Sequence, residues 1–255
     1  MYFSQAALTN LANGYTALDD KLSKLVEGYV VLNLQQPRAR EFASQGFPRR
    51  VKTMARCIKN VFALIPPERQ ELPSSDELSD ATINIQSFIF NTYGAIDNLA
   101  WIWVSEKGQK RGDGTSIPDT HVGLGPNNIS VRQLLPAALQ AYLATLDEWL
   151  EYLASLRHAL AHRIPLYIPP YVIEDADAAA YDELAKKMSA AIKALDFTAY
   201  DALSAEQLNL GRFQPWISQS FAEGAKPVVF HPQLLADFNT VDEVGHKVLA
   251  ELRGA

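Results

Sequence analysis

The sequence predicts a mainly α-helical protein: a helical bundle with a C-terminal extension in which two short segments could pair as a β-hairpin. Three observations favour this fold class. Apolar residues recur at spacings of three and four over several long segments. Prolines and glycine-rich stretches separate these segments. One segment, residues 81–104, is apolar on nearly all sides, which is typical of a central, buried helix.

Composition limits the classes of protein to consider. With 255 residues, 48% of them hydrophobic, the chain can form one sizeable core or one core with an appended subdomain. A charged fraction of 20% argues against global disorder. The formal net charge is -6, so RNA binding would need a local basic patch rather than an overall positive field.

Cysteine content and the distribution of apolar residues indicate the compartment. The single cysteine, Cys57, cannot form an internal disulfide, and it has no CxxC partner. The first residues lack the basic start and apolar run of a signal peptide. No apolar run approaches the roughly 20 residues that span a bilayer. We therefore expect a soluble, cytoplasmic protein without a membrane partner.

The first two helices are expected near residues 8–34 and 48–65, and Pro37 and Pro66 end them. The second helix has one apolar face and one basic face. Two interpretations of the basic face stay open, an ordinary solvated surface and the patch that RNA binding requires. Its residues are Arg49, Arg50, Lys52, Arg56 and Lys59.

The apolar helix at 81–104 carries polar residues that need an explanation in a buried setting, namely Asn91, Asp97 and Asn98. A loop rich in glycine and proline follows at 106–130. A second long helix is expected over 131–163. Pro136 marks either its start or a bend, and Pro165 ends it.

The remaining chain is less regular. Residues 164–173 favour an extended conformation, and a helix is expected over 178–195 with Asp177 as its N-cap. Residues 212–218 and 227–231 could pair as the β-hairpin. A last helix is expected from Asp237 or Thr240 to about residue 252. The chain therefore divides into a helical bundle at 1–164 and a C-terminal extension at 165–255 packed on it.

Histidine and arginine side chains cluster where the second long helix ends, in the run Arg157-His158-Ala-Leu-Ala-His162-Arg163. On an ideal helix His158 and His162 lie about 40° apart and can face one cleft, whereas Arg157 lies about 140° from His162. Metal-free RNA cleavage needs a base for the 2′-hydroxyl, an acid for the leaving oxygen and a cation for the phosphorane-like transition state. Histidine and arginine are suited to these tasks.

This run resembles the Arg-x4-His motif of the HEPN superfamily. The buried segment Phe90-Asn-Thr-Tyr-Gly-Ala-Ile-Asp97-Asn-Leu-Ala-Trp101 is similar to the partner helix of uncharacterised bacterial HEPN-like proteins. In those proteins a His-Arg-Ile-Pro run also follows the motif, as His162-Arg-Ile-Pro165 does here. The resemblance covers about residues 80–170, and the two segments together are more specific than either alone.

The resemblance implies an up-and-down bundle of four or five helices that forms a homodimer, with the two motifs lining one cleft. It implies a metal-independent endoribonuclease without a cofactor, acting in stress response, a toxin–antitoxin pair or antiviral defence. Arg157 and His162 would be the catalytic pair, with His158 as the auxiliary polar residue. Asp97 would orient Arg157 or His162. Asn98, Asn91 and Arg163 are expected as further supporting residues.

Other interpretations remain open. A non-catalytic HEPN-like module would bind a nucleotide or a protein partner, such as a cognate antitoxin or inhibitor, and a structural cluster would satisfy Arg157 and His162 through Asp97 and backbone carbonyls. A metal site on His158 and His162 has the right spacing. However, Ala159 stands where zinc helices carry glutamate, and no third ligand is evident, so no metal is expected.

Overall fold

The computed structural model describes residues 2–220 and 226–254, and this part of the chain is mainly helical with one small antiparallel β pair, as predicted. The two strands are β1 (Trp216–Ile217) and β2 (Val228–Val229). Short helical turns are η1 (Phe42–Gly46) and η2 (Asp119–His121). The α-helices are α1 (Gln5–Thr16), α2 (Leu18–Val30), α3 (Pro37–Glu41), α4 (Phe47–Leu64), α5 (Ser75–Lys107), α6 (Ile129–Arg132), α7 (Ala137–Ala144), α8 (Asp147–His162), α9 (Ala178–Lys193), α10 (Phe197–Leu208) and α11 (Phe230–Arg253).

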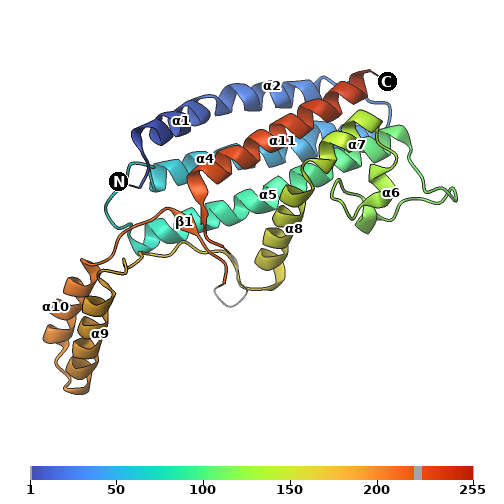
Figure 1. The fold of residues 1–255 in the computed structure, drawn as a ribbon. Helices are drawn as coiled ribbons and strands as arrows, with labels where there is room; N and C mark the ends of the chain where they lie inside the picture. The colour runs from blue at the N-terminus through green and yellow to red at the C-terminus, as the bar shows by residue number, and fades with distance from the viewer. Residues whose placement is uncertain (1, 221–225, 255) are drawn as a thin grey trace.

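An elongated bundle of α1, α2, α4, α5 and α11 forms the body of the molecule (Figure 1). Helix α5 runs through the bundle and is buried at many positions from Ala81 to Val104, as its apolar pattern predicts, although Ile83 and Phe90 are exposed. It starts at Ser75, earlier than expected, because Ser74 and Glu77 form a reciprocal capping box there. It ends at Gly108, which adopts the left-handed conformation with φ 58°.

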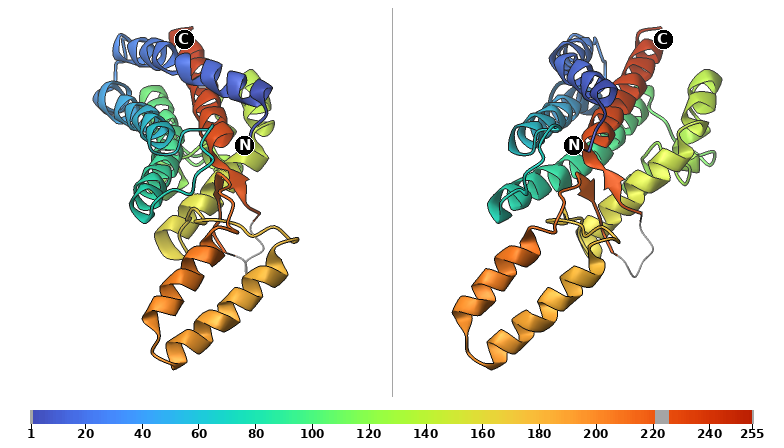
Figure 2. Two further views of the ribbon diagram at one scale, coloured as in Figure 1. Left: turned by 90° about the vertical axis from the view of Figure 1, so that its left-hand side faces the viewer. Right: turned by 60° about the vertical axis from the view of Figure 1, so that its left-hand side comes forward.

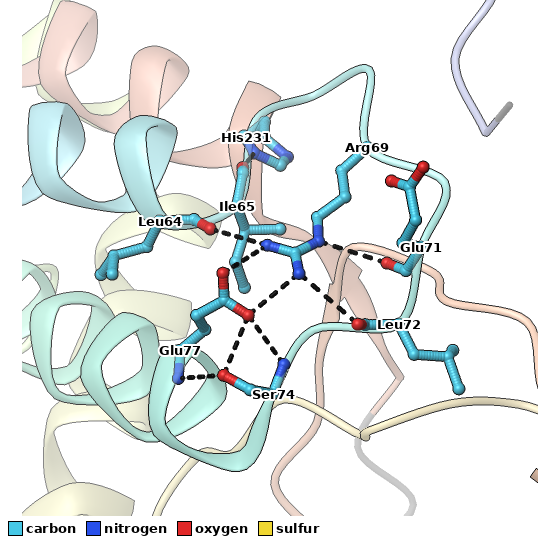
Figure 3. A network of polar contacts seen from close by, with 8 residues as sticks. All are labelled: Leu64, Ile65, Arg69, Glu71, Leu72, Ser74, Glu77 and His231. Carbon is cyan, nitrogen blue, oxygen red and sulfur yellow. Dashed lines mark hydrogen bonds and ion pairs between the residues drawn. The ribbon is translucent and has the colours of Figure 1, made fainter.

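The connection between α4 and α5 is held by Arg69 (Figure 3). Its guanidinium donates to both carboxylate oxygens of Glu77, at 2.7 and 2.9 Å, and to the carbonyl of Leu64 at 3.1 Å. Hydrogen bonds from Arg69 and Ser74 lower the pKa of Glu77 to about 2. This network fixes the turn that places α4 and α5 side by side.

The last helix, α11, lies within the bundle rather than in an extension packed outside it. It runs parallel to α2, and the buried hydroxyl of Tyr29 donates to the carbonyl of Gly245 at 2.7 Å. A Cβ on Gly28 would lie 2.5 Å from Cδ2 of Leu249, so glycine allows this approach without displacing the leucine side chain. The helix begins at Phe230, earlier than the predicted Asp237 or Thr240, because Phe230 and His231 in its first turn are fully buried. The bundle therefore closes with residues from the far end of the sequence.

Two predicted helices are interrupted. The helix expected at 8–34 divides at Ala17 into α1 and α2, where the Thr16 hydroxyl donates to the carbonyl of Ala12, a contact that bends helices. The helix expected at 131–163 is three helices. Pro136 is extended and precedes α7, which settles the alternative left open at that residue, and Thr145 forms a tight turn before α8. The predicted end of α8 near Arg163 is confirmed.

A helical hairpin of α9 and α10 projects from one end of the bundle (Figure 2). An antiparallel bridge between Val172 and Arg212 closes its base. The segment 164–173 is extended, as predicted, and Tyr167 pairs with Ser218 beside the β pair. Asp177 occupies the N-cap position of α9, but its side chain makes no capping hydrogen bond.

Candidate functional site

The sequence motif lies at the exposed end of α8. This helix attaches to the bundle through one buried face, formed by Leu150, Leu153, Leu156 and Ala159. His158 and His162 lie on the opposite side, Arg157 lies beside Leu150 and Leu153 at the edge of the buried face, and all three side chains are exposed. The helix ends at His162, and Pro165 prevents its continuation. The motif side chains are therefore accessible to a ligand from solvent.

The two histidines form a pair on the surface of α8. Their ring centroids are 5.1 Å apart, with an angle of 55° between the ring planes. The contact follows from their i, i+4 spacing. Within residues 2–220 and 226–254, neither imidazole has a hydrogen-bond or ion-pair partner. Both rings thus keep their nitrogens available.

Arg157 faces a different side of the helix, toward α5. Its guanidinium carbon lies 5.1 Å from the centroid of the Tyr93 ring, a cation–π contact. This orientation agrees with the angle of about 140° between Arg157 and His162 on an ideal helix. Among the described residues, no direct contact joins Arg157 to His162 within one chain.

Asp97 is a partly buried carboxyl group beside Arg157. Burial raises its pKa to about 6, and the charges of Arg157 and Arg50 act in the opposite direction. No hydrogen bond, and no ion pair within 4 Å, is made by Asp97 in the part of the chain that the structure describes. The structure therefore brings Asp97 near Arg157 but does not lock the two together.

Arg50, at the start of α4, also belongs to this site, although the sequence indicated it only as part of a basic face. Its Nη1 donates to Oδ1 of Asn91 at 3.2 Å. Its guanidinium crosses Gly94, where a Cβ would lie 2.8 Å from the Arg50 Cζ. The signal in the sequence is Gly94, a glycine inside a long buried helix, which marks a close approach.

The other expected supporting residues take different positions. Asn98 is buried on a different face of α5 from Asp97, where its Oδ1 would lie 2.6 Å from a Cβ on Gly46. It therefore packs against η1 and does not reach the motif. Arg163 folds back on α8 toward the carbonyl and hydroxyl of Ser155, both at 3.5 Å.

A cavity of about 440 Å³ adjoins this cluster, between α5, α8 and the loop at 125–128. Asp97 and Tyr93 line it from α5, and Leu150 and Leu153 line it from α8. The volume lies within the range of about 300 to 1,000 Å³ that is usual for small-molecule sites. A larger cavity, about 610 Å³, lies between α1 and the connection after α4, away from the motif.

The basic face expected on α4 is partly neutralised. Lys59 donates to both carboxylate oxygens of Asp19, at 2.6 and 2.8 Å, and Arg49 donates to Gln45. Lys52 and Arg56 are exposed. Only Arg50 turns from this helix toward the motif.

Comparisons with protein-family models, with curated proteins and with solved structures give no match to this chain. Among the described residues, no group of three or more histidine, cysteine, aspartate or glutamate side chains could hold a metal ion. Within those same residues, no helix combines the length and the apolar character that crossing a membrane requires.

Proposed function

We propose that this protein is a HEPN-type, metal-independent endoribonuclease whose catalytic residues are Arg157, His158 and His162. The observation that carries the proposal is the pair of exposed imidazoles, 5.1 Å apart, on the helix that also presents Arg157. Two imidazoles without other partners can act as one base and one acid.

The reaction is an internal transesterification. One imidazole, neutral, accepts the proton of the RNA 2′-hydroxyl as this oxygen attacks the phosphorus. The bond from phosphorus to the 5′ oxygen breaks, and the second imidazole, protonated, gives its proton to that oxygen. The products are a 2′,3′-cyclic phosphate and a 5′-hydroxyl. No metal ion or cofactor is consumed.

Arg157 stabilises the phosphorane-like transition state. A guanidinium forks onto two phosphate oxygens, and its charge is best used where negative charge develops. Support comes from the lack of a direct bond between Arg157 and Asp97, since an arginine locked by a carboxylate could not reorient to a phosphate.

The active form in this proposal is a homodimer. Within one chain Arg157 and the histidine pair face different sides of α8. A second copy packed against this end of α8 would bring His162 of the partner subunit to the same phosphate as Arg157. Such a nuclease would act in stress response, a toxin–antitoxin pair or antiviral defence, under a cognate inhibitor.

The test is RNA cleavage in EDTA by the purified full chain, beside Arg157→Ala, His158→Ala and His162→Ala. We expect Arg157→Ala and His162→Ala to lose at least about 100-fold in rate, the usual loss for an acid–base or transition-state contact. His246→Ala is the matched control, because this half-exposed histidine lies on α11 beside Asp242 and should leave cleavage unchanged. No cleavage by the wild type, or equal cleavage by all variants, would reject the nuclease.

A second candidate is a module that binds a nucleotide or a protein partner without cutting RNA. The cavity beside Asp97 favours its nucleotide-binding form, because a volume of about 440 Å³ suits a small ligand. Nucleotide binding without cleavage in EDTA would select this candidate over the nuclease.

A further inference from the structure

The cavity beside Asp97 has a composition that points to its occupant. Its walls from α8 are apolar, with Leu150 and Leu153, and Tyr93 adds an aromatic side chain. Its polar side chains include the carboxyl groups of Asp97 and Glu151 and the amides of Asn127 and Asn128. Apolar walls with a few polar groups suit a planar ring that carries hydrogen-bonding atoms on its edge.

Asp97 is the group that this cavity leaves unsatisfied. It is partly buried, and none of the described residues donates a hydrogen bond to it. A partly buried carboxylate without donors is costly, so a ligand that brings donors gains from filling the site. Arg157 and Arg50 stand near it without bonding to it. They make the surroundings favourable for a ligand that also carries negative charge.

The hydrogen-bonding edges of the four RNA bases differ in what they offer to a carboxylate. Guanine presents two adjacent donors, N1–H and the 2-amino group, which match the two carboxylate oxygens. Adenine and cytosine each place one amino donor beside a ring acceptor, and uracil places one N–H between two carbonyls. On each of these three bases, a hydrogen-bond acceptor would face one carboxylate oxygen, so the carboxylate would gain only one hydrogen bond.

Arg157 of the motif also lies close to the cavity, since its guanidinium contacts Tyr93. Arg157 follows Leu150, Leu153 and Ala154 at helical spacings of seven, four and three, so it lies on the same face of α8. Its guanidinium sits over Tyr93, which lines the cavity. A nucleotide with its base near Asp97 would therefore extend its phosphate toward Arg157.

We infer that this cavity is a guanine-binding subsite, in which the Asp97 carboxylate accepts hydrogen bonds from N1–H and the 2-amino group of a guanine nucleotide. The inference rests on the proposed function in one respect, because it takes the ligand to be RNA. The bound guanine is then the base next to the phosphate that the nuclease cleaves. Asn127 supplies an amide donor for the guanine O6.

The experiment is calorimetric titration of the full chain with GMP, AMP, CMP and UMP, which needs no cleavage. We expect GMP to bind at least about 10-fold more tightly than the others, as one hydrogen bond to a charged group is worth about that factor. Inosine monophosphate, which lacks only the 2-amino group, should bind about 10-fold more weakly than GMP. Equal binding of GMP and inosine monophosphate would overturn the bidentate contact, whatever the variants do.

Asp97→Asn should abolish the preference for GMP, because its amide replaces one acceptor by a donor. Glu151→Gln is the matched control, since Glu151 is the other carboxyl group of the cavity but is exposed. Loss of the preference in Glu151→Gln but not in Asp97→Asn would overturn the assignment. A GMP preference without RNA cleavage would reject the nuclease and keep the subsite. Cleavage without any GMP preference would keep the nuclease and reject the subsite.

Discussion

At the scale of single residues, two acids of similar pKa have opposite surroundings. Burial raises the pKa of both Asp97 and Asp237 to about 6. Asp237, on α11, accepts hydrogen bonds from Trp149 at 2.8 Å and from Gln233 at 2.7 Å. Asp97 accepts none from the described residues. Asp237 therefore fastens α8 to α11, whereas Asp97 remains available to a ligand.

Asp237 should make stability depend on pH. Because its folded pKa, about 6, exceeds the unfolded value of 3.8, the folded protein holds this proton more tightly. Its contribution is therefore complete below about pH 4 and is lost as the pH rises through 6. The loss should be about 3 kcal/mol.

Asp237→Asn keeps the Oδ1 that accepts from Trp149 and Gln233, but it cannot ionise. Urea unfolding between about pH 4 and 7 should show a fall in stability that is smaller in the variant than in the wild type by about this amount, because Asp97 still titrates in both proteins. Asp182→Asn, at an exposed position on α9, is the control and should follow the wild type. If the unfolding free energy of Asp237→Asn fell with pH as steeply as that of the wild type, Asp237 would not be the cause of the pH dependence.

At the scale of elements, the apolar periodicity predicted which segments are helical, while side-chain contacts decided where they stop. The buried α5 and the end of α8 at Pro165 follow from local pattern. The early start of α11 depends on the burial of Phe230 and His231 against other elements, which local pattern does not contain, and the break at Ala17 leaves the apolar spacing unchanged. For the same reason α10 was not predicted, since its apolar residues have no clear helical face and it packs mainly on α9.

The residues of the candidate site were likewise predictable only in part. The motif Arg157, His158 and His162 and the partner Asp97 could be found from the sequence, because unusual side chains stand out in apolar helices. Arg50 could not, because its position depends on α4 crossing α5 at Gly94. Asn98 looked equivalent to Asp97 in the sequence, but one residue along a helix turns a side chain by about 100°.

The capping box at the start of α5 should stabilise the bundle. Ser74→Ala removes the acceptor of the Glu77 backbone N–H and should cost about 1 kcal/mol. Ser79→Ala, on the exposed face of the same helix, should change stability by less than about 0.5 kcal/mol. Thermal or urea unfolding measures both. An equal effect of the two substitutions would mean that the cap does not hold the α4–α5 connection.

At the scale of the whole molecule, the chain after residue 164 serves two different purposes. The α9–α10 hairpin leaves the bundle and returns at the bridge between Val172 and Arg212. After it, α11 enters the bundle and contributes buried residues along its whole length. The bundle therefore needs the end of the sequence but not the hairpin before it.

Replacing residues 174–210 by a short glycine-containing turn should leave a folded bundle, because Val172 and Arg212 are already paired. Removing α11 should abolish cooperative unfolding, because it exposes the core side chains packed against that helix. Circular dichroism with urea titration distinguishes the two outcomes. An unfolded protein after excision of the hairpin would show that the hairpin stabilises the bundle.

We propose that the exposed pair His158 and His162, with Arg157, cleaves RNA by internal transesterification. The most direct test of this proposal is mass spectrometry of the ends left on a defined, guanine-containing RNA after incubation with the full chain in EDTA. We expect 2′,3′-cyclic phosphate and 5′-hydroxyl ends that disappear with His162→Ala. Ends with 3′-hydroxyl and 5′-phosphate groups, or the same products from His162→Ala, would contradict it.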